Sequence, residues 1–462
     1  MAKSDKINFS TPSGFPEFLP SEKRLEVYLL DIIRRVFESY GFTPIETPAV
    51  ERLEVLQAKG NQGDNIIYGI DPILPPNRQA EKDKSGETGL EARALKFDQT
   101  VPFAAYIARH LNELTFPFAR YQMDMVFRGE RAKDGRFRQF RQCDIDVVAR
   151  GKLSLLYDAQ MPAIITEIFE DINIGDFVIR INNRKILTGF FRSLEVEENQ
   201  IKACIATIDN LEKSGEAKVK LELEKEGISS EQTERIIEFI KIDGSVDNVL
   251  DKLNHLAQSF PEAEQFNLGV TELATVINGV RDLGVADKRF CIDLSIARGL
   301  NYYTGTVYET TLIGHEALGS ICSGGRYEEL VGIFLGEKMP GVGISIGLTR
   351  LISRLLKAGI LNTLSATPTQ VVVVNMQEDL IPVYLKVSQQ LRQAGINVVT
   401  NFEKRPLGKQ FQAADKQGIQ FCVIIGADEA AAQKSSLKDL KSGEQVEVAL
   451  ADLAEEIKRR LT

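Results

Sequence analysis

The chain has 462 residues, of which 43% are hydrophobic and 26% are charged, and its formal net charge is −9. This composition is typical of a soluble globular protein, and the length predicts two or three domains. The negative charge argues against indiscriminate nucleic-acid binding, although a local group of cations can still contact phosphates.

The N-terminal residues contain no apolar run of the signal-peptide type, and no apolar stretch approaches the roughly 20 residues that span a bilayer. The five cysteines are scattered without a CxxC pair, and the three histidines lie far from them in the sequence. We therefore expect a cytoplasmic protein with no membrane contact, reduced thiols and no tightly bound metal.

The first expected element is a helix from Ser21 to about Tyr40, where apolar residues recur at helical spacing and Gly41 follows as a stop. A strand at 43–47 comes next and ends before Pro48. An ordinary core helix explains this pattern without any further function. Residues 60–93 are rich in glycine, proline and charge, which predicts a loop.

A short strand and a helix are expected around Asp98 and Thr100, with Pro102 early in the helix. The Asp98 carboxylate and the Thr100 hydroxyl could together hold an ammonium group. By itself this pair is a weak signal, because an Asp-x-Thr sequence before a helix is more often a simple cap.

Residues 121–150 are the most informative segment, since they predict two strands joined by a basic turn that contains glycine. The stretch from 128 to 141 holds more cations (Arg128, Arg131, Lys133, Arg136, Arg138 and Arg141) than anions (Glu130 and Asp134). In a chain of negative net charge, this local excess indicates an anionic partner. A solvated hairpin with scattered surface ion pairs is the simpler alternative.

The faces of these two strands are also unusual. Alternate residues of a strand share a face, so Arg128 and Glu130 are expected together on the first strand. One face of the second strand carries Arg138, Phe140, Gln142, Asp144 and Asp146. Such a face is a poor core surface, because buried unpaired charge is costly. It suits a ligand that is anionic at one end, flat in the middle and cationic at the other.

The composition changes in residues 195–288, which are rich in Glu and Lys and predict helical segments. Gly227 is expected to stop one helix, and a capping box from Ser229 to Gln232 to begin the next. Nothing in this block suggests catalysis. We expect a helical insertion, and the alternative is a continuation of the surrounding domain.

Two later segments also carry chemistry. Residues 297–309 read ARGLNYYTGTVYE. A fixed guanidinium at Arg298 could stabilise negative charge on a phosphate. The alternative is a strand with a salt bridge and core tyrosines.

Residues 341–351 read GVGISIGLTRL, a strand of small residues followed by a helix with Arg350 near its start. The small residues could let a nucleotide approach the strand, or they could allow tight packing on a helix. No GxxxxGK[ST] or convincing GxGxxG sequence is present, which excludes P-loop and Rossmann sites.

The last part of the chain, from about 368, alternates strands (371–374, 396–400 and 421–425) with helices (381–394, 407–418 and 450–461). Lys404, Arg405 and Lys409 lie where a loop enters a helix. They are candidates for RNA contacts, or alternatively form a solvated helix face.

Taken together, these segments resemble the class II aminoacyl-tRNA synthetases. FRGERAKDGRFRQFRQCDID is similar to motif 2 of the histidyl branch, ARGLNYYTGTVYE to the histidyl-specific segment, and GVGISIGLTRL to motif 3. The resemblance implies an α+β fold, with an antiparallel sheet flanked by helices, a helical insertion and a C-terminal α/β anticodon-binding domain. The helix from Ser21, the strand at 43–47 and Pro48 resemble motif 1, which forms the dimer interface in this family. The implied domains are residues 1–194 (catalytic core, motifs 1 and 2), 195–288 (insertion), 289–360 (catalytic core, histidyl segment and motif 3) and 368–462 (anticodon-binding domain).

The implied activity is that of a histidine–tRNA ligase, a homodimer that activates histidine with ATP and magnesium and transfers it to the 3′ end of tRNA(His). Carried over from the family, the catalytic residues are Arg128 and Arg298. Histidine is bound by Asp98, Thr100, Gln142, Asp146, Arg298, Tyr302 and Tyr303. ATP is bound by Arg128, Glu130, Arg136, Arg138, Phe140 and Arg350. The tRNA contacts are Arg131 and Lys133.

Two departures from the family pattern are visible. Asn301 stands where the family more usually has aspartate, and the loop RAKDGR lacks the Pro-Gln pair of many histidyl enzymes, so how the acceptor end is read stays open.

Two rival functions remain. A regulatory paralogue that partners an ATP phosphoribosyltransferase is disfavoured because Arg128, Arg298 and Arg350 are all present. A prolyl- or threonyl-type enzyme is disfavoured by the RGLNYY segment.

Overall fold

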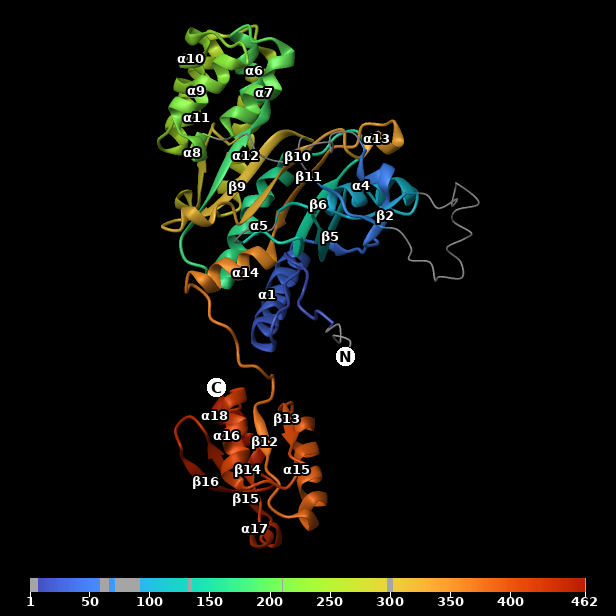
Figure 1. Ribbon diagram of the computed structural model, residues 1–462. Coiled ribbons are helices and arrows are strands. Elements are labelled where there is room, and N and C mark those ends of the chain that lie inside the picture. The colour runs from blue at the N-terminus through green and yellow to red at the C-terminus, as the bar shows by residue number, and fades with distance from the viewer. Residues whose placement is uncertain are drawn as a thin grey trace, which may run out of the picture. The chain divides into compact units, whose positions relative to one another are not determined.

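The computed structural model describes residues 7–58, 66–70, 92–131, 135–209, 211–296 and 302–461. The chain divides into two compact units, Met1–Pro16 with Leu29–Leu361 and Glu17–Tyr28 with Asn362–Thr462 (Figure 1). Helix α1 (Pro20–Ser39) contributes residues to both. Its end agrees with the prediction, because Gly41 adopts a φ of +82° that stops a helix.

The first unit is built on a large sheet with the strand order β1-β5-β6-β11-β10-β9-β7-β8. The strands are β1 (Thr43–Pro44), β5 (Phe118–Phe127), β6 (Gln139–Val148), β11 (Gly341–Ile346), β10 (Cys322–Tyr327), β9 (Tyr303–Leu312), β7 (Phe177–Asn183) and β8 (Phe290–Ile292). Neighbours from β5 to β7 are antiparallel, whereas β1 pairs with β5, and β7 with β8, in parallel. The predicted antiparallel sheet is thus confirmed in its middle, and parallel strands are added at its edges.

Helices and a small second sheet flank this sheet. Helix α5 (Leu156–Ile172) packs against β10 and β11, and α14 (Leu348–Lys357) packs against β6. The small sheet has the order β2 (Val50–Arg52), β4 (Arg93–Leu95), β3 (Gly69–Ile70). Helices α2 (Leu53–Leu56), α4 (Thr100–Arg109) and α13 (Gly332–Leu335) lie beside it around a shared core. The α+β fold expected from the sequence is confirmed.

The helical block contains α6 (Arg184–Ser193), α7 (Glu198–Ile208), α8 (Leu211–Ser214), α9 (Glu216–Lys225), α10 (Ser230–Ile240), α11 (Val246–Ser259) and α12 (Glu264–Asp282). Helices α6 to α11 gather at one end of the first unit (Figure 1). The predicted stop at Gly227 (φ +89°) and the capping box between Ser229 and Gln232 are both present. The boundaries at 195 and 288 stay predictions.

The second unit contains a sheet with the order β13 (Val398–Thr400), β12 (Val371–Val373), β14 (Phe421–Ile424), β15 (Lys434–Asp439), β16 (Gln445–Ala449). Helices α15 (Ile381–Gln393) and α18 (Leu453–Leu461) contribute to the core on one face, and α16 (Leu407–Gln417) to the core on the other. The sequence patterns missed α17 (Ala427–Ala431) and the β15–β16 hairpin. β16 forms the sheet edge and β15 lies between it and β14. Both strands carry many polar residues, so they lack the apolar runs that mark central strands.

Candidate active site

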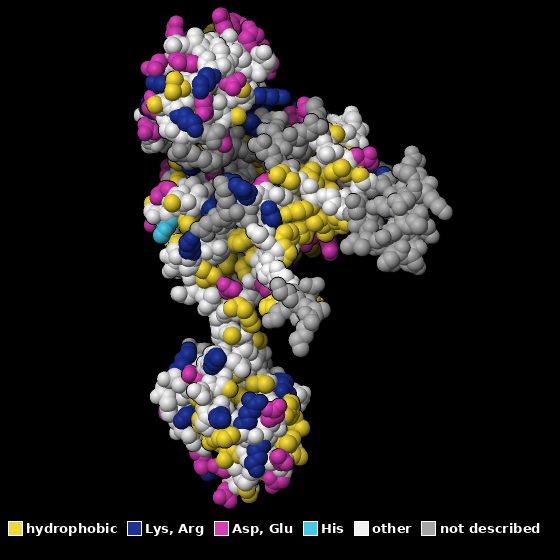
Figure 2. All heavy atoms as spheres, viewed as in Figure 1, with side chains coloured by type: hydrophobic (Ala, Val, Ile, Leu, Met, Phe, Trp, Pro, Cys, Tyr) yellow, Lys and Arg dark blue, Asp and Glu magenta, His cyan; other side chains and the backbone are white. Residues whose placement is uncertain are grey.

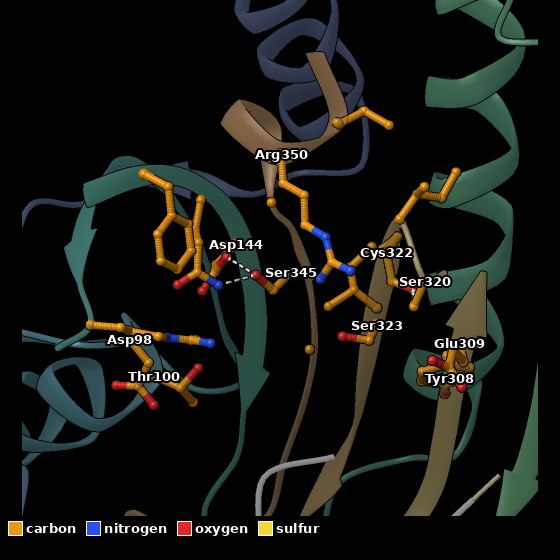
Figure 3. A pocket seen from close by; sticks show the side chains of 18 of the residues that line it. Asp98, Thr100, Asp144, Tyr308, Glu309, Ser320, Cys322, Ser323, Ser345 and Arg350 are labelled. Atoms are coloured by element: carbon orange, nitrogen blue, oxygen red, sulfur yellow. Dashed lines mark hydrogen bonds between the residues drawn. The ribbon is translucent and has the colours of Figure 1, made fainter. Parts of the chain in front are cut away.

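A cavity of about 590 Å³ opens over the middle strands of the large sheet (Figure 3). Its size is typical of small-molecule sites. The predicted site residues in its wall are Asp98, Thr100, Arg128, Glu130, Arg136, Phe140, Gln142, Asp146, Tyr302, Tyr303 and Arg350. Of the predicted residues that the structure describes, Arg131 and Arg138 lie outside this wall. Arg298 and Lys133, like Asn301, are outside the described residues.

Strand register brings distant segments together at this cavity. Asp146 of β6 lies opposite Arg120 of β5 on one side and opposite Gly343 of β11 on the other. A Cβ atom at Gly343 would lie 2.3 Å from Asp146 Oδ1, and one at Gly341 would lie 2.4 Å from the Tyr327 ring. The sequence left two explanations for these glycines, room for a nucleotide or tight packing on a helix. At these two positions the space is taken by protein side chains, which the glycines allow to approach the strand.

Three buried carboxylates, those of Asp98, Asp144 and Asp146, line the cavity beside one buried cation, Arg120. Arg120 donates a hydrogen bond to Asp146 Oδ2, and the Tyr327 hydroxyl donates one of 3.0 Å to Oδ1. Burial raises the pKa of Asp98 and of Asp146 to about 6 and that of Asp144 to about 7, with Arg120 opposing each shift. This excess of buried negative charge favours a cationic ligand.

The sequence patterns did not single out Arg120 or Tyr327. A signal for Arg120 exists, because polar residues alternate along β5 as they do along β6. Pairing the two strands about their turn would have placed Arg120 against Asp146.

Within the residues that the structure describes, two acceptor oxygens in the wall are buried and accept no hydrogen bond: Asp98 Oδ2 and Gln142 Oε1. The other Asp98 oxygen accepts from the Val101 backbone N–H at 3.2 Å, as in a helix cap. Asp98, one residue before the N-cap Gln99, therefore both accepts from the first turn of α4 and directs an acceptor to the cavity. Two buried acceptors without partners are costly unless a donor such as an ammonium group joins them.

The cations of the wall come from three places. Arg128 follows β5, its Nε donates to the Phe97 carbonyl oxygen at 3.1 Å, and its guanidinium lies 5.1 Å from the centre of the Phe140 ring. Arg136 lies in the hairpin turn, and Arg350 lies in the first turn of α14. Arg354, one helical turn further, was not predicted, although its spacing of four from Arg350 places both on one helix face.

The strand faces expected for the hairpin need one correction. β5 ends at Phe127 and β6 begins at Gln139, so Arg128 and Glu130 are not strand residues and Arg138 precedes its strand. Arg138 Nε donates to the Glu130 carbonyl oxygen at 3.0 Å, and its Nη1 donates to the Ser13 carbonyl oxygen at 3.3 Å. The observed contacts of Arg138 thus hold the turn and the N-terminal segment.

Tyr302 and Tyr303 stand at the start of β9, with ring centres 4.9 Å apart in an edge-to-face arrangement. Burial raises the pKa of both phenols above their usual value, so both hydroxyls keep their protons and can donate hydrogen bonds. The wall also contains Tyr308, Glu309 and the residues from Ser320 to Ser323, none of which the sequence patterns had assigned to the site.

The described residues form no group of three or more His, Cys, Asp or Glu side chains that could hold a metal ion. No described helix has the length and apolar character needed to cross a membrane. All five cysteines lie among the described residues, and none of them forms a disulfide there.

Comparison with known proteins decides the family. The family model for histidyl-tRNA synthetase matches residues 14–351, and the model for the anticodon binding domain matches residues 370–460. The chain belongs to the histidyl-tRNA synthetase family. A family member from Trichormus variabilis, named histidine--tRNA ligase, is 88% identical over 462 residues and covers both chains fully.

Solved structures of similar proteins support this family membership. The crystal structure of the family member from Nostoc sp. PCC 7120 has a TM-score of 0.90 and 83% identity, and the match covers 98% of this chain and 100% of that one. A Bacillus halodurans protein, described as an ATP phosphoribosyltransferase regulatory subunit/histidyl-tRNA synthetase, has a TM-score of 0.71 at 16% identity and covers 88% of this chain and 97% of that one. At that identity the likeness extends to the fold alone.

Proposed function

We propose that this protein is a histidine–tRNA ligase, which forms histidyl-adenylate from histidine and ATP, releases pyrophosphate and passes histidine to the 3′ end of tRNA(His). The proposal is supported by the family membership and by full-length relatives of that name. The structural observation that carries it is the pair of buried acceptors, Asp98 Oδ2 and Gln142 Oε1, beside Asp146 in one cavity of the described structure.

In this proposal histidine lies across the middle strands. Asp98, Thr100 and Gln142 hold its ammonium group, while Asp146 and Tyr303 bond the two imidazole nitrogens, with Tyr302 alongside. A side chain that cannot bond both Asp146 and Tyr303 leaves buried polar groups unpaired, and such a mismatch can cost several powers of ten in specificity.

Adenylate formation needs no general base, since the histidine carboxylate already carries the negative charge that attacks the α-phosphate. Arg128 and Arg298 flank that phosphate and stabilise the charge that develops on its oxygens. Phe140 stacks on adenine, with Glu130 nearby. The remaining phosphates are neutralised by Arg136, Arg138 and Arg350.

Magnesium would enter as part of the ATP substrate. The carboxylates of Glu130 and Glu309 line the cavity and are the hard oxygen ligands that magnesium prefers. They are the residues that would hold the ion, which supplies charge neutralisation.

The tRNA is proposed to contact both parts of the chain. Arg131 and Lys133 of the motif 2 loop reach the acceptor end, and the domain that matches the anticodon-binding model contacts the anticodon. Lys404, Arg405 and Lys409 are exposed in that domain, and Figure 2 shows lysine and arginine side chains spread over its visible face. Such cations suit contacts with phosphates.

We further propose a cytoplasmic homodimer with the domain boundaries predicted above. A dimer is supported by apolar surface on the first unit: hydrophobic side chains gather on its visible face (Figure 2), and Phe9 is 98% exposed. Sedimentation of the purified protein at micromolar concentration tests this, because a monomer would contradict it.

The decisive experiment is ATP–pyrophosphate exchange with a panel of amino acids, followed by aminoacylation of tRNA(His). Exchange with histidine alone is expected. Arg298→Ala should lower exchange at least about a hundredfold, the scale of one transition-state donor. Exchange with a different amino acid, or with none, would refute the proposal, and the second outcome would favour a regulatory paralogue.

A further inference from the structure

A chain of hydrogen bonds joins three side chains of the cavity wall. Gln142 Nε2 of β6 donates to Ser345 Oγ of β11 at 2.6 Å, and Ser345 Oγ donates to Asp144 Oδ1 of β6 (Figure 3). The register of the two strands places Ser345 directly opposite Asp144. Gln142 and Asp144 are 8% and 3% exposed, so water competes little for these bonds.

The chemistry of these groups fixes the direction of the chain. An ionised carboxylate can only accept, so it takes the single proton of the Ser345 hydroxyl. The Ser345 oxygen can then only accept, and the Gln142 group facing it must be the NH2 donor. Gln142 Oε1 is therefore turned away from Ser345, and in the described part of the chain it is buried without a partner. Its orientation follows from the serine and the aspartate.

We propose that Ser345 and Asp144 are positioning residues that lock the Gln142 amide with its oxygen toward the substrate ammonium group. This inference rests on the proposed function, because it assumes that histidine is the ligand and that Gln142 contacts its ammonium. Neither residue needs to touch histidine. Without the Ser345 hydroxyl, the amide can rotate and present its NH2 donors to a cation that only donates, which removes one acceptor from the ammonium site.

The pH of the test is chosen so that the Asp144 carboxyl group is ionised. Burial raises its pKa to about 7, so at pH 8 the carboxyl group is mostly ionised and the direction of the chain is defined. Other groups that interact electrostatically with this carboxyl group are Arg120, Asp98, Asp146, Tyr303 and Cys322.

The test compares Ser345→Ala with Ser345→Thr by histidine-dependent ATP–pyrophosphate exchange at pH 8. Ser345→Ala should raise the KM for histidine about tenfold, the scale of one mispaired buried group, while kcat and the KM for ATP stay within about twofold. Ser345→Thr keeps the hydroxyl and should restore the KM to within about threefold. A structural fault would instead lower kcat and would not be corrected by threonine.

A double-mutant cycle with Gln142→Ala isolates the mechanism. Once the amide is gone, Ser345→Ala should change the KM for histidine by less than twofold. An unchanged KM in Ser345→Ala, or an equal increase with and without Gln142, overturns the inference. Failure of the proposed function is distinguishable, because then the parent protein itself shows no exchange with histidine.

Discussion

Replacing Gly343 by alanine is the sharpest test of how the strands build the cavity. An added Cβ would lie 2.3 Å from Asp146 Oδ1, 2.3 Å from the Ile145 carbonyl oxygen and 2.7 Å from Asp146 Cγ. All three separations are far below van der Waals contact. Either the Asp146 carboxylate rotates away, or β11 separates from β6.

The free energy lost in Gly343→Ala can be worked out from the hydrogen bonds that rotation of the Asp146 carboxylate would break. Asp146 would lose its hydrogen bonds from Arg120 and Tyr327. Bonds to a charged group contribute about 1.5–3 kcal/mol each, so the loss is at least about 3 kcal/mol. If Asp146 bonds the imidazole, rotation of the carboxylate also removes that bond to the substrate. A loss of about 1.5–3 kcal/mol corresponds to a drop of roughly tenfold to a hundredfold in kcat/KM for histidine.

Pyrophosphate exchange and thermal unfolding measure this effect, and both activity and Tm should fall. The matched control is Gly408→Ala in α16, where nothing lies within 4 Å of the added Cβ. That exposed helical position should tolerate alanine or gain about 0.5–1 kcal/mol, with unchanged kinetics. If Gly343→Ala kept histidine kinetics within threefold and the parental Tm, the close packing derived for β11 would be incorrect.

Three further outcomes are expected. The KM for histidine should rise as pH falls below about 6, because Asp98, whose pKa burial raises to about 6, must be ionised to hold the ammonium. Asp98→Asn should raise the KM at pH 8 and make it rise less steeply at low pH, since only the titrations of Asp144, Asp146 and the substrate imidazole remain. An identical profile in both proteins would exclude Asp98. Arg120→Met leaves Asp146 unpaired in the interior and should destabilise the protein by about 3–5 kcal/mol in urea unfolding, with weaker histidine binding; parental stability would contradict this. Arg326→Met breaks the buried pair with Asp158, outside the cavity wall, and should cost similar stability while the KM for histidine changes less than about twofold.

Most of the fold was predictable from local patterns. The helix stop at Gly41, the capping box at Ser229 and the strands around the basic turn each depend on a few neighbouring residues. Strands β15 and β16 escaped prediction because both carry many polar residues, and β16, as the edge strand, needs no apolar run.

The residue patterns predicted the candidate site as strand faces and short segments, and the family resemblance supplied the individual roles. Faces follow from alternation within a strand, but partners depend on which strands pair and in what register. Arg120 and Tyr327 contact Asp146 although they lie 26 and 181 residues away from it in the sequence. Ser345 was noted only for its small size, since nothing local indicated that its hydroxyl joins Gln142 to Asp144.

In the described part of the chain, one oxygen of Asp98 and one of Gln142 are buried without a hydrogen bond, which lowers the stability of the protein. Selection for heat resistance alone would favour hydrocarbon side chains at both positions, because an empty site that keeps unpaired oxygens is less stable than a filled one. The two oxygens would then be kept because the protein must bind its substrate. Histidine, by donating hydrogen bonds to them, should raise the Tm of the protein.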